Sequence, residues 1–127
     1  MKYAFENLEV WQKSRILVKS VYQLTNTFPN DGKYELTSQL RRASISVSSN
    51  IAEGSTRWSH KDQARFYEIA FGSLIEVLNQ LILSDDLNFL PGDSMKNIRT
   101  DIDSIDRMLN SLHQSTKKLI TPSAKKL

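Results

Sequence analysis

Residues 95–116 read MKNIRTDIDSIDRMLNSLHQST, and this stretch decides the fold class. Its apolar and small residues recur at alternating steps of three and four positions, which is the spacing of one face of an α-helix. The members of this stripe are Met95, Ile98, Ile102, Ile105, Leu109, Leu112 and Thr116. Because the pattern continues through three heptads, we predict a long helix that packs along other helices.

Three more amphipathic helices are predicted upstream, at about residues 8–27, 34–53 and 59–86. Segments rich in helix-breaking or loop-forming residues separate them. These segments read FPNDG at 28–32, STRW at 55–58 and NFLPG at 88–92. Four amphipathic helices and three short loops predict an all-α fold, in the form of an antiparallel up-down-up-down four-helix bundle.

Local signals predict the helix ends and one helix crossing. Asn7 is expected to cap the first helix, and Ser59, followed by Asp62, is expected to cap the third. Gly54 is expected just after the second helix, at the C′ position where a positive φ favours glycine. Gly72-Ser73 lies inside a predicted helix, where the glycine costs about 1 kcal/mol relative to alanine, and we therefore predict a close helix crossing at this pair.

Length and composition indicate one domain. The chain has 127 residues, of which 39% are hydrophobic and 24% are charged, and it has no cysteine. We predict a single bundle domain at 1–120 and a short, basic, mobile tail at 121–127. The absence of cysteine excludes disulfides and thiolate metal sites. No apolar run approaches the roughly 20 residues of a membrane span, so we expect no membrane span and a cytoplasmic location.

The sequence shows no arrangement typical of catalysis. A di-iron bundle needs Glu-x-x-His pairs on two helices, and neither His60 nor His113 has a glutamate three positions before it. The glycines are scattered, so no phosphate-binding glycine loop is present. A catalytic serine needs a histidine beside it as a general base, and neither of the two histidines is evidently placed to serve any of the serines in this way. We therefore expect no catalytic residue, no metal, no cofactor and no enzymatic activity.

Clustered basic residues give the main functional indication. The formal net charge is +3 and the sequence pI is about 9.2, which favours weak attraction to polyanions. Neighbouring arginine and lysine side chains can neutralise phosphates and release counterions. The candidate nucleic-acid-binding residues are Arg41, Arg42, Arg57, Lys61 and Arg65. The alternative is a solvated structural face, in which Arg41 or Arg42 pairs with a carboxylate such as Glu53 or Glu76.

Two further features have alternative interpretations. Trp58 follows Arg57, and it either stacks on a base, as in single-strand binders, or packs onto the start of the third helix as a hydrophobic staple. Trp11 is expected in the core or at an interface. The third helix carries two apolar stripes where a surface helix needs one. This width indicates either a central position in the bundle or a second face for self-association.

The chain resembles a known protein family in several ordered blocks. The blocks are FENLEVWQ at 5–12, VYQLT at 21–25 leading to FP at 28–29, QLRRAS at 39–44, NIAEG at 50–54 and RFYEIAFGSLIE at 65–76. Their order and spacing resemble the four-helix-bundle family of bacterial proteins encoded by intervening sequences within 23S ribosomal RNA genes. The resemblance covers about residues 5–90, and the last helix matches only in its pattern.

This resemblance implies an assembly and a class of partner. It implies a homopentameric ring of bundles, similar to the accessory protein of diversity-generating retroelements, which is basic and associates with nucleic acid and a reverse transcriptase. The positions that match the family motif either contact RNA or hold the bundle and ring together, and they are Arg41, Arg42, Asn50, Glu53 and Arg65. The leading hypothesis is an oligomeric protein that binds structured RNA through phosphate contacts. The alternative is a scaffold that binds another protein.

Overall fold

The computed structural model describes residues 2–29 and 34–120. These ranges contain four α-helices and one short 3-10 helix, and they contain no strand. The elements in chain order are η1 (Ala4–Asn7), α1 (Glu9–Thr25), α2 (Tyr34–Ser55), α3 (His60–Asp86) and α4 (Ser94–Lys117). The predicted all-α class with four helices is therefore confirmed. The predicted tail at 121–127 lies outside the described residues.

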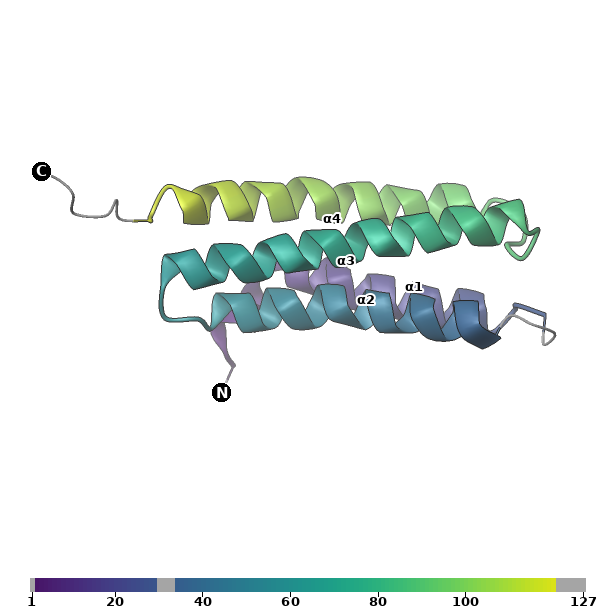
Figure 1. The fold of residues 1–127 in the computed structure, drawn as a ribbon, viewed down its shortest axis with the longest axis horizontal. Helices are drawn as coiled ribbons and strands as arrows, with labels where there is room; N and C mark the ends of the chain where they lie inside the picture. The colour runs from purple at the N-terminus through teal and green to yellow at the C-terminus, as the bar shows by residue number, and fades with distance from the viewer. Residues whose placement is uncertain (1, 30–33, 121–127) are drawn as a thin grey trace, which may run out of the picture.

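The four long helices lie side by side (Figure 1). The α2–α3 connection is at one end of the molecule, and the α3–α4 connection is at the other, where α1 ends and α2 begins. α2 contacts α1 and α3, while α4 contacts α3 and α1. Each helix can therefore bury one face against two neighbours, as the amphipathic pattern requires.

The predicted stripes form the core between the helices. On α4 the buried members are Ile98, Ile102, Ile105, Leu109 and Thr116. From α1 and α2 the core receives Val10, Ser14, Leu17, Val21, Leu40, Ala43 and Val47. Full burial of a large aliphatic side chain contributes roughly 1.5–3 kcal/mol of transfer free energy. Hydrophobic burial along these seams is therefore what holds the four helices together.

The ends of α1 differ from the prediction. Asn7 ends η1 instead of capping α1, and Leu8 occupies the N-cap position without a side-chain hydrogen bond. At its other end α1 stops at Thr25, and the turn that follows buries Phe28. The ring of Phe28 lies 5.5 Å from that of Phe89, centroid to centroid. Burial of this aromatic side chain accounts for the early end of the helix.

The cap of α3 follows the prediction. The Ser59 side chain accepts a hydrogen bond from the backbone N–H of Asp62 at 3.1 Å. Asp62 also places a negative charge in the first turn, where the helix dipole favours it. The start of α3 is thus fixed by its own local sequence.

The prediction for Gly54 was wrong. α2 continues through Gly54 to Ser55, and the positive φ found among the described glycines belongs to Gly92. A Cβ added at Gly54 would lie 2.8 Å from Tyr67 Cε1 and 2.9 Å from Phe66 Cβ. This position needs glycine because α3 lies directly against it and leaves no room for a side chain. A positive φ is not the reason, since Gly54 lies within the helix.

The crossing predicted at Gly72-Ser73 is confirmed, but the glycine is not the residue in contact. A Cβ added at Gly72 would meet nothing within 4 Å, so no helix lies against this residue. The close contact of α2 and α3 lies one position further along, where Ser73 Oγ is 2.8 Å from Ser46 Oγ. The small residue that permits this approach is therefore serine.

α3 carries more apolar surface than the bundle covers. By length and composition it could span a membrane, although only 33% of its most apolar part is buried in the structure. A single helix of this kind is weak evidence for a membrane span, because a helix in the core of a bundle can have the same length and composition, and its apolar residues form no continuous run, as predicted. Its exposed apolar side chains are Ile69, Phe71, Ile75, Ile82 and Leu83. This exposed set favours the second-face interpretation of the wide apolar pattern.

Candidate nucleic-acid interface

The structure divides the five candidate cations into two groups. Arg41 and Arg42 lie in α2 beside the end of α1, whereas Arg57, Lys61 and Arg65 lie in and after the α2–α3 connection. At about 1.5 Å of rise per residue, Arg41 and Arg57 are roughly 24 Å apart along the helix axis. The two groups therefore belong to separate surfaces.

Arg41 holds α2 to the end of α1. Its Nε donates a hydrogen bond to Thr25 Oγ1 at 2.9 Å, and its Nη2 donates one to Asn26 Oδ1 at 2.9 Å. Its guanidinium carbon lies 4.4 Å from the centroid of the Tyr22 ring. These partners are a hydroxyl, an amide and an aromatic ring, and the carboxylate proposed as the alternative is not among them. Arg41 is thus engaged within the fold.

Arg42 has a different environment, although it is the next residue. It is exposed, and it makes no hydrogen bond or ion pair within residues 2–29 and 34–120. It lines an open groove together with Tyr22, Thr37 and Ile45. Because Arg41 is occupied, this groove offers a single available guanidinium, which gives it little capacity to hold a polyanion.

Arg57, Lys61, Arg65 and Lys117 come together at the α2–α3 end of the molecule, and we call this set the basic corner. Lys61, Arg65 and Lys117 line one surface hollow. Arg57 and Arg65 approach the same ring, with guanidinium carbons 4.3 Å and 5.7 Å from the Phe66 centroid. The loop, α3 and α4 each contribute to the basic corner, and cation–π contacts orient two of its members.

The α2–α3 connection holds the basic corner in place. The backbone N–H of Arg57 donates to the Gly54 carbonyl oxygen at 3.2 Å, and Gln63 Nε2 donates to the Arg57 carbonyl oxygen at 3.1 Å. Ser59 caps α3 in the same connection. The positive end of the α3 dipole therefore lies beside Lys61 and adds to the positive potential.

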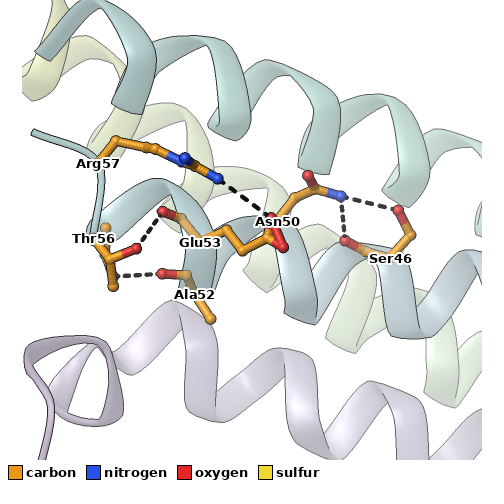
Figure 2. Close-up of polar contacts among 7 residues, drawn as sticks. Ser46, Asn50, Ala52, Glu53, Thr56 and Arg57 are labelled. Carbon is orange, nitrogen blue, oxygen red and sulfur yellow. Dashed lines mark hydrogen bonds and ion pairs between the residues drawn. The ribbon is translucent and has the colours of Figure 1, made fainter. Parts of the chain in front are cut away.

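Acidic residues border the basic corner. Asp62 and Glu68 line the same hollow as the cations. Glu53 Oε2 lies 3.7 Å from Arg57 Nη2, as Figure 2 shows, and both side chains are about half exposed. Exposed pairs of this kind typically contribute about 0–1 kcal/mol. Arg57 can therefore exchange Glu53 for a phosphate at little cost.

The Asn50 side chain is bonded within α2, to the serine that contacts α3, which favours a structural role for this motif position. Its Nδ2 donates to the Ser46 carbonyl oxygen at 2.8 Å and to Ser46 Oγ at 3.0 Å (Figure 2). Ser46 Oγ in turn lies 2.8 Å from Ser73 Oγ on α3. The result is a short polar chain from α2 to α3 at the point where the helices approach closely.

The two tryptophans differ in exposure. Trp58 is fully exposed at 102%, so it does not pack onto the start of α3, and the staple interpretation was wrong. Trp11 is half-buried against the core, as predicted, with its ring 4.9 Å from that of Phe5 in an edge-on arrangement. Of the two tryptophans, Trp58 is therefore the one whose whole ring is available to a partner.

Other titratable groups form contacts within the bundle. His113 Nε2 lies 2.8 Å from Glu68 Oε2 and links α4 to α3, while His60 Nδ1 lies 2.9 Å from Gln63 Oε1. Burial raises the pKa of the Tyr67 phenol above its ordinary value. Within the described ranges, no group of three or more His, Asp or Glu side chains is placed to hold a metal ion.

Sequence reasoning missed Lys117 as a member of the site. It was not among the candidate residues, and it lies far from Lys61 in the sequence. Its place beside Lys61 depends on how far α4 runs relative to α3, which no local pattern specifies. The surplus of lysine at the end of α4 was the available signal.

Comparisons with known proteins identify a family and a fold. The profile of the family described as 23S rRNA-intervening sequence protein matches residues 6–111. A crystal structure of a protein of unknown function from the S23 ribosomal protein family, from Bacteroides thetaiotaomicron, is similar with a TM-score of 0.76 and 23% sequence identity. The similarity covers 83% of this chain and 98% of that chain. No curated protein matches the sequence.

Proposed function

Since the chain belongs to the 23S rRNA-intervening sequence protein family, we propose that it is a non-catalytic, oligomeric protein that binds structured RNA. The observation that carries this proposal is the basic corner, where cations from α3 and α4 line one surface hollow and Arg57 of the connecting loop shares the Phe66 ring with Arg65. The family description points to ribosomal RNA as the context. The contacts would be made to phosphates, which position a protein on RNA without reading its sequence.

The geometry of the basic corner suits a phosphate backbone. Arginine offers planar, bidentate donors to phosphate oxygens, and lysine offers a mobile point charge. Arg57, Arg65 and Lys61 are exposed, and the partner of Arg57 within the fold is the weakly held Glu53. Asp62 and Glu68 limit the net positive charge, so we expect modest affinity that depends strongly on salt.

Salt-dependent binding tests this function. Anisotropy of a fluorescein-labelled RNA hairpin is measured with the natural protein, with the variant K61Q/R65Q/K117Q, and with the control K96Q/R99Q/R107Q. The control removes the same charge from exposed positions of α4. Three phosphate contacts predict a slope of log K against log salt of about −2.7, or a loss of about 40-fold between 50 and 200 mM salt. The basic-corner variant should flatten this slope, while the control variant should retain it.

The competing function is a protein-interaction scaffold. If the natural protein forms no complex with RNA at 50 mM salt, the RNA-binding proposal fails and the scaffold function replaces it. If both triple variants lose affinity equally, the attraction comes from overall charge, and the basic corner has no specific role. Both results can be read from the same titrations.

We further propose that the helices form an up-down-up-down bundle and that the bundles assemble as a homopentameric ring. Connections at alternate ends of the molecule support the first part (Figure 1). Exposed apolar side chains on α3 support self-association, since Phe71, Ile75 and Ile82 are 38% to 46% exposed and follow helical spacing along one face. Sedimentation equilibrium should find a pentamer at micromolar concentration and a smaller species for Phe71→Ser/Ile75→Ser. A monomeric natural protein would contradict the ring.

A cytoplasmic location is part of the same proposal. In an oligomer, the exposed apolar face of α3 is covered by another copy of the chain and needs no lipid. Cell fractionation should therefore find the protein in the soluble fraction. Recovery in the membrane fraction would instead assign the apolar face of α3 to the bilayer.

A further inference from the structure

Trp58 stands at the basic corner with its whole side chain in solvent. Its exposure of 102% is the largest among the exposed apolar residues of the described ranges. A tryptophan normally buries much of its large apolar surface, in a core or an interface. Its neighbours in the chain are Arg57, which belongs to the basic corner, and Ser59, which caps α3. An exposed aromatic face therefore lies next in the chain to a cation of the basic corner.

Hydrogen bonds hold the backbone on both sides of Trp58, so the place where its side chain leaves the chain is defined. Before it, the Arg57 N–H donates to Gly54 and the Arg57 carbonyl accepts from Gln63. After it, Ser59 Oγ accepts from the backbone of Asp62. Because the loop backbone is already ordered, binding would not have to order it, which favours affinity.

We propose that Trp58 is a stacking platform for an unpaired nucleobase, while the basic corner holds the phosphates beside that base. This inference depends on the proposed RNA-binding function and specifies its ligand, which is a single-stranded nucleotide segment such as the loop or bulge of a folded RNA. Proteins that bind single strands combine a cationic track with aromatic side chains on which bases stack. Trp58 and the basic corner supply one of each.

The ligand must be unpaired because of the chemistry of stacking. In a duplex both faces of each internal base are covered by its neighbours, and the deep major groove of A-form RNA excludes side chains. An indole can therefore stack only on a base that is free in a loop, a bulge or a strand end. Single-stranded DNA offers the same face and phosphates but lacks the 2′-hydroxyl.

The test compares single-stranded and double-stranded probes at one salt concentration. The probes are fluorescein-labelled oligouridine, oligodeoxythymidine of the same length and a blunt RNA duplex. The variants are Trp58→Ala, Trp58→Phe, K61Q/R65Q/K117Q and the control Leu87→Ala, which truncates an exposed apolar side chain at the end of α3 far from the corner. Anisotropy gives the affinities, and quenching of tryptophan emission that is lost in Trp58→Phe reports stacking directly.

Trp58→Ala should weaken oligouridine binding about 10-fold, within the range of roughly 5-fold to 150-fold expected for one stacked base. Trp58→Phe should weaken it less, because phenylalanine keeps an aromatic face. Duplex binding should be unchanged by either substitution, whereas K61Q/R65Q/K117Q should weaken binding to all three probes. Leu87→Ala should bind like the natural protein. Tighter binding of oligouridine than of oligodeoxythymidine would show that the ligand is RNA. Equal binding of the two would show that the site accepts single-stranded RNA and DNA alike.

Several results would overturn the inference. If Trp58→Ala binds oligouridine as well as the natural protein does, while K61Q/R65Q/K117Q still weakens it, the stacking role is wrong and the proposed RNA-binding function stands. If the natural protein binds no probe, the proposed function fails and the stacking role fails with it. If Trp58→Ala changes the sedimentation of the protein, Trp58 lies between copies of the chain and is not available to a base.

Discussion

Replacing Gly54 with alanine should destabilise the protein, although this change is usually favourable inside a helix. Alanine is better than glycine by about 1 kcal/mol in a helix interior. At Gly54, however, the new Cβ would lie 2.8 Å and 3.0 Å from two carbons of the Tyr67 ring, well inside the optimal separation of about 3.5–4.0 Å. Tyr67 is only 3% exposed and so has little room to move. Overpacking costs about 1–3 kcal/mol, and contacts of 3.0 Å or less with a buried ring place this variant in the upper part of that range, at about 2–3 kcal/mol, which leaves a net loss of about 1–2 kcal/mol.

Urea unfolding followed by circular dichroism measures this effect. With a slope of about 1–3 kcal/mol per molar urea, the midpoint should fall by about 0.5–1 M. The matched control is Gly72→Ala, where the new Cβ meets nothing within 4 Å and the free energy of unfolding should rise by about 0.5–1 kcal/mol. Protein concentrations must be equal, since association shifts apparent stability. If both variants gain stability, the close approach of α3 to Gly54 is refuted.

Two other substitutions test the assignments made above. Arg41→Ala should lower the free energy of unfolding by about 1–3 kcal/mol, because it removes two hydrogen bonds made by a charged, half-buried group. Arg42→Ala should change the free energy of unfolding by less than about 0.5 kcal/mol, because Arg42 is exposed. Equal effects of the two substitutions in urea unfolding would contradict the structural role of Arg41. Burial raises the pKa of Tyr67, so the folded protein keeps this proton at a pH where the unfolded chain loses it, and stability should fall as pH rises above 10.0. Tyr67→Phe should reduce this decline in urea titrations between pH 8 and 11, and an unchanged decline would contradict the assignment.

The fold class could be predicted because it depends on a repeated signal. The stripe on α4 returns at every turn, so a single irregular residue such as Thr116 does not obscure it. The Ser59 cap could be predicted for a similar reason, because the whole interaction lies within four consecutive residues. Features that depend on a periodic or a local pattern can therefore be predicted from the sequence without knowledge of the tertiary structure.

The prediction for Gly54 failed, and the crossing predicted at Gly72-Ser73 was correct only at Ser73, because both depend on neighbours that are distant in the sequence. Gly54 has the local context of a helix end, yet the atoms that exclude a side chain there belong to Tyr67 and Phe66 on the next helix. Gly72 has the local context of a crossing, yet it faces solvent. A one-residue difference in the rotation of α3 decides which small residue is in contact. No pattern within one helix specifies that rotation.

The same limit applied to the candidate site, where composition identified cations but could not determine which were free. Arg41 and Lys61 look equivalent in the sequence, since each is a basic residue near others of its kind. In the structure Arg41 donates hydrogen bonds to Thr25 and Asn26, while Lys61 lines an open hollow together with Lys117. Binding a phosphate through Arg41 would require those internal hydrogen bonds to break, whereas binding through Lys61 requires no internal hydrogen bond to break.

This difference separates the family motif from the proposed RNA-binding surface. Among the motif positions, Arg41 joins α2 to the end of α1, Asn50 is bonded to Ser46 within α2, and Arg65 belongs to the basic corner. The corner is completed by residues outside the set of motif positions, namely Lys61, Lys117 and Arg57. In this chain Arg41 and Asn50 therefore support the packing of the helices, and most of the charge of the corner comes from other positions. Affinity for RNA should then follow the corner residues and not the degree of motif identity.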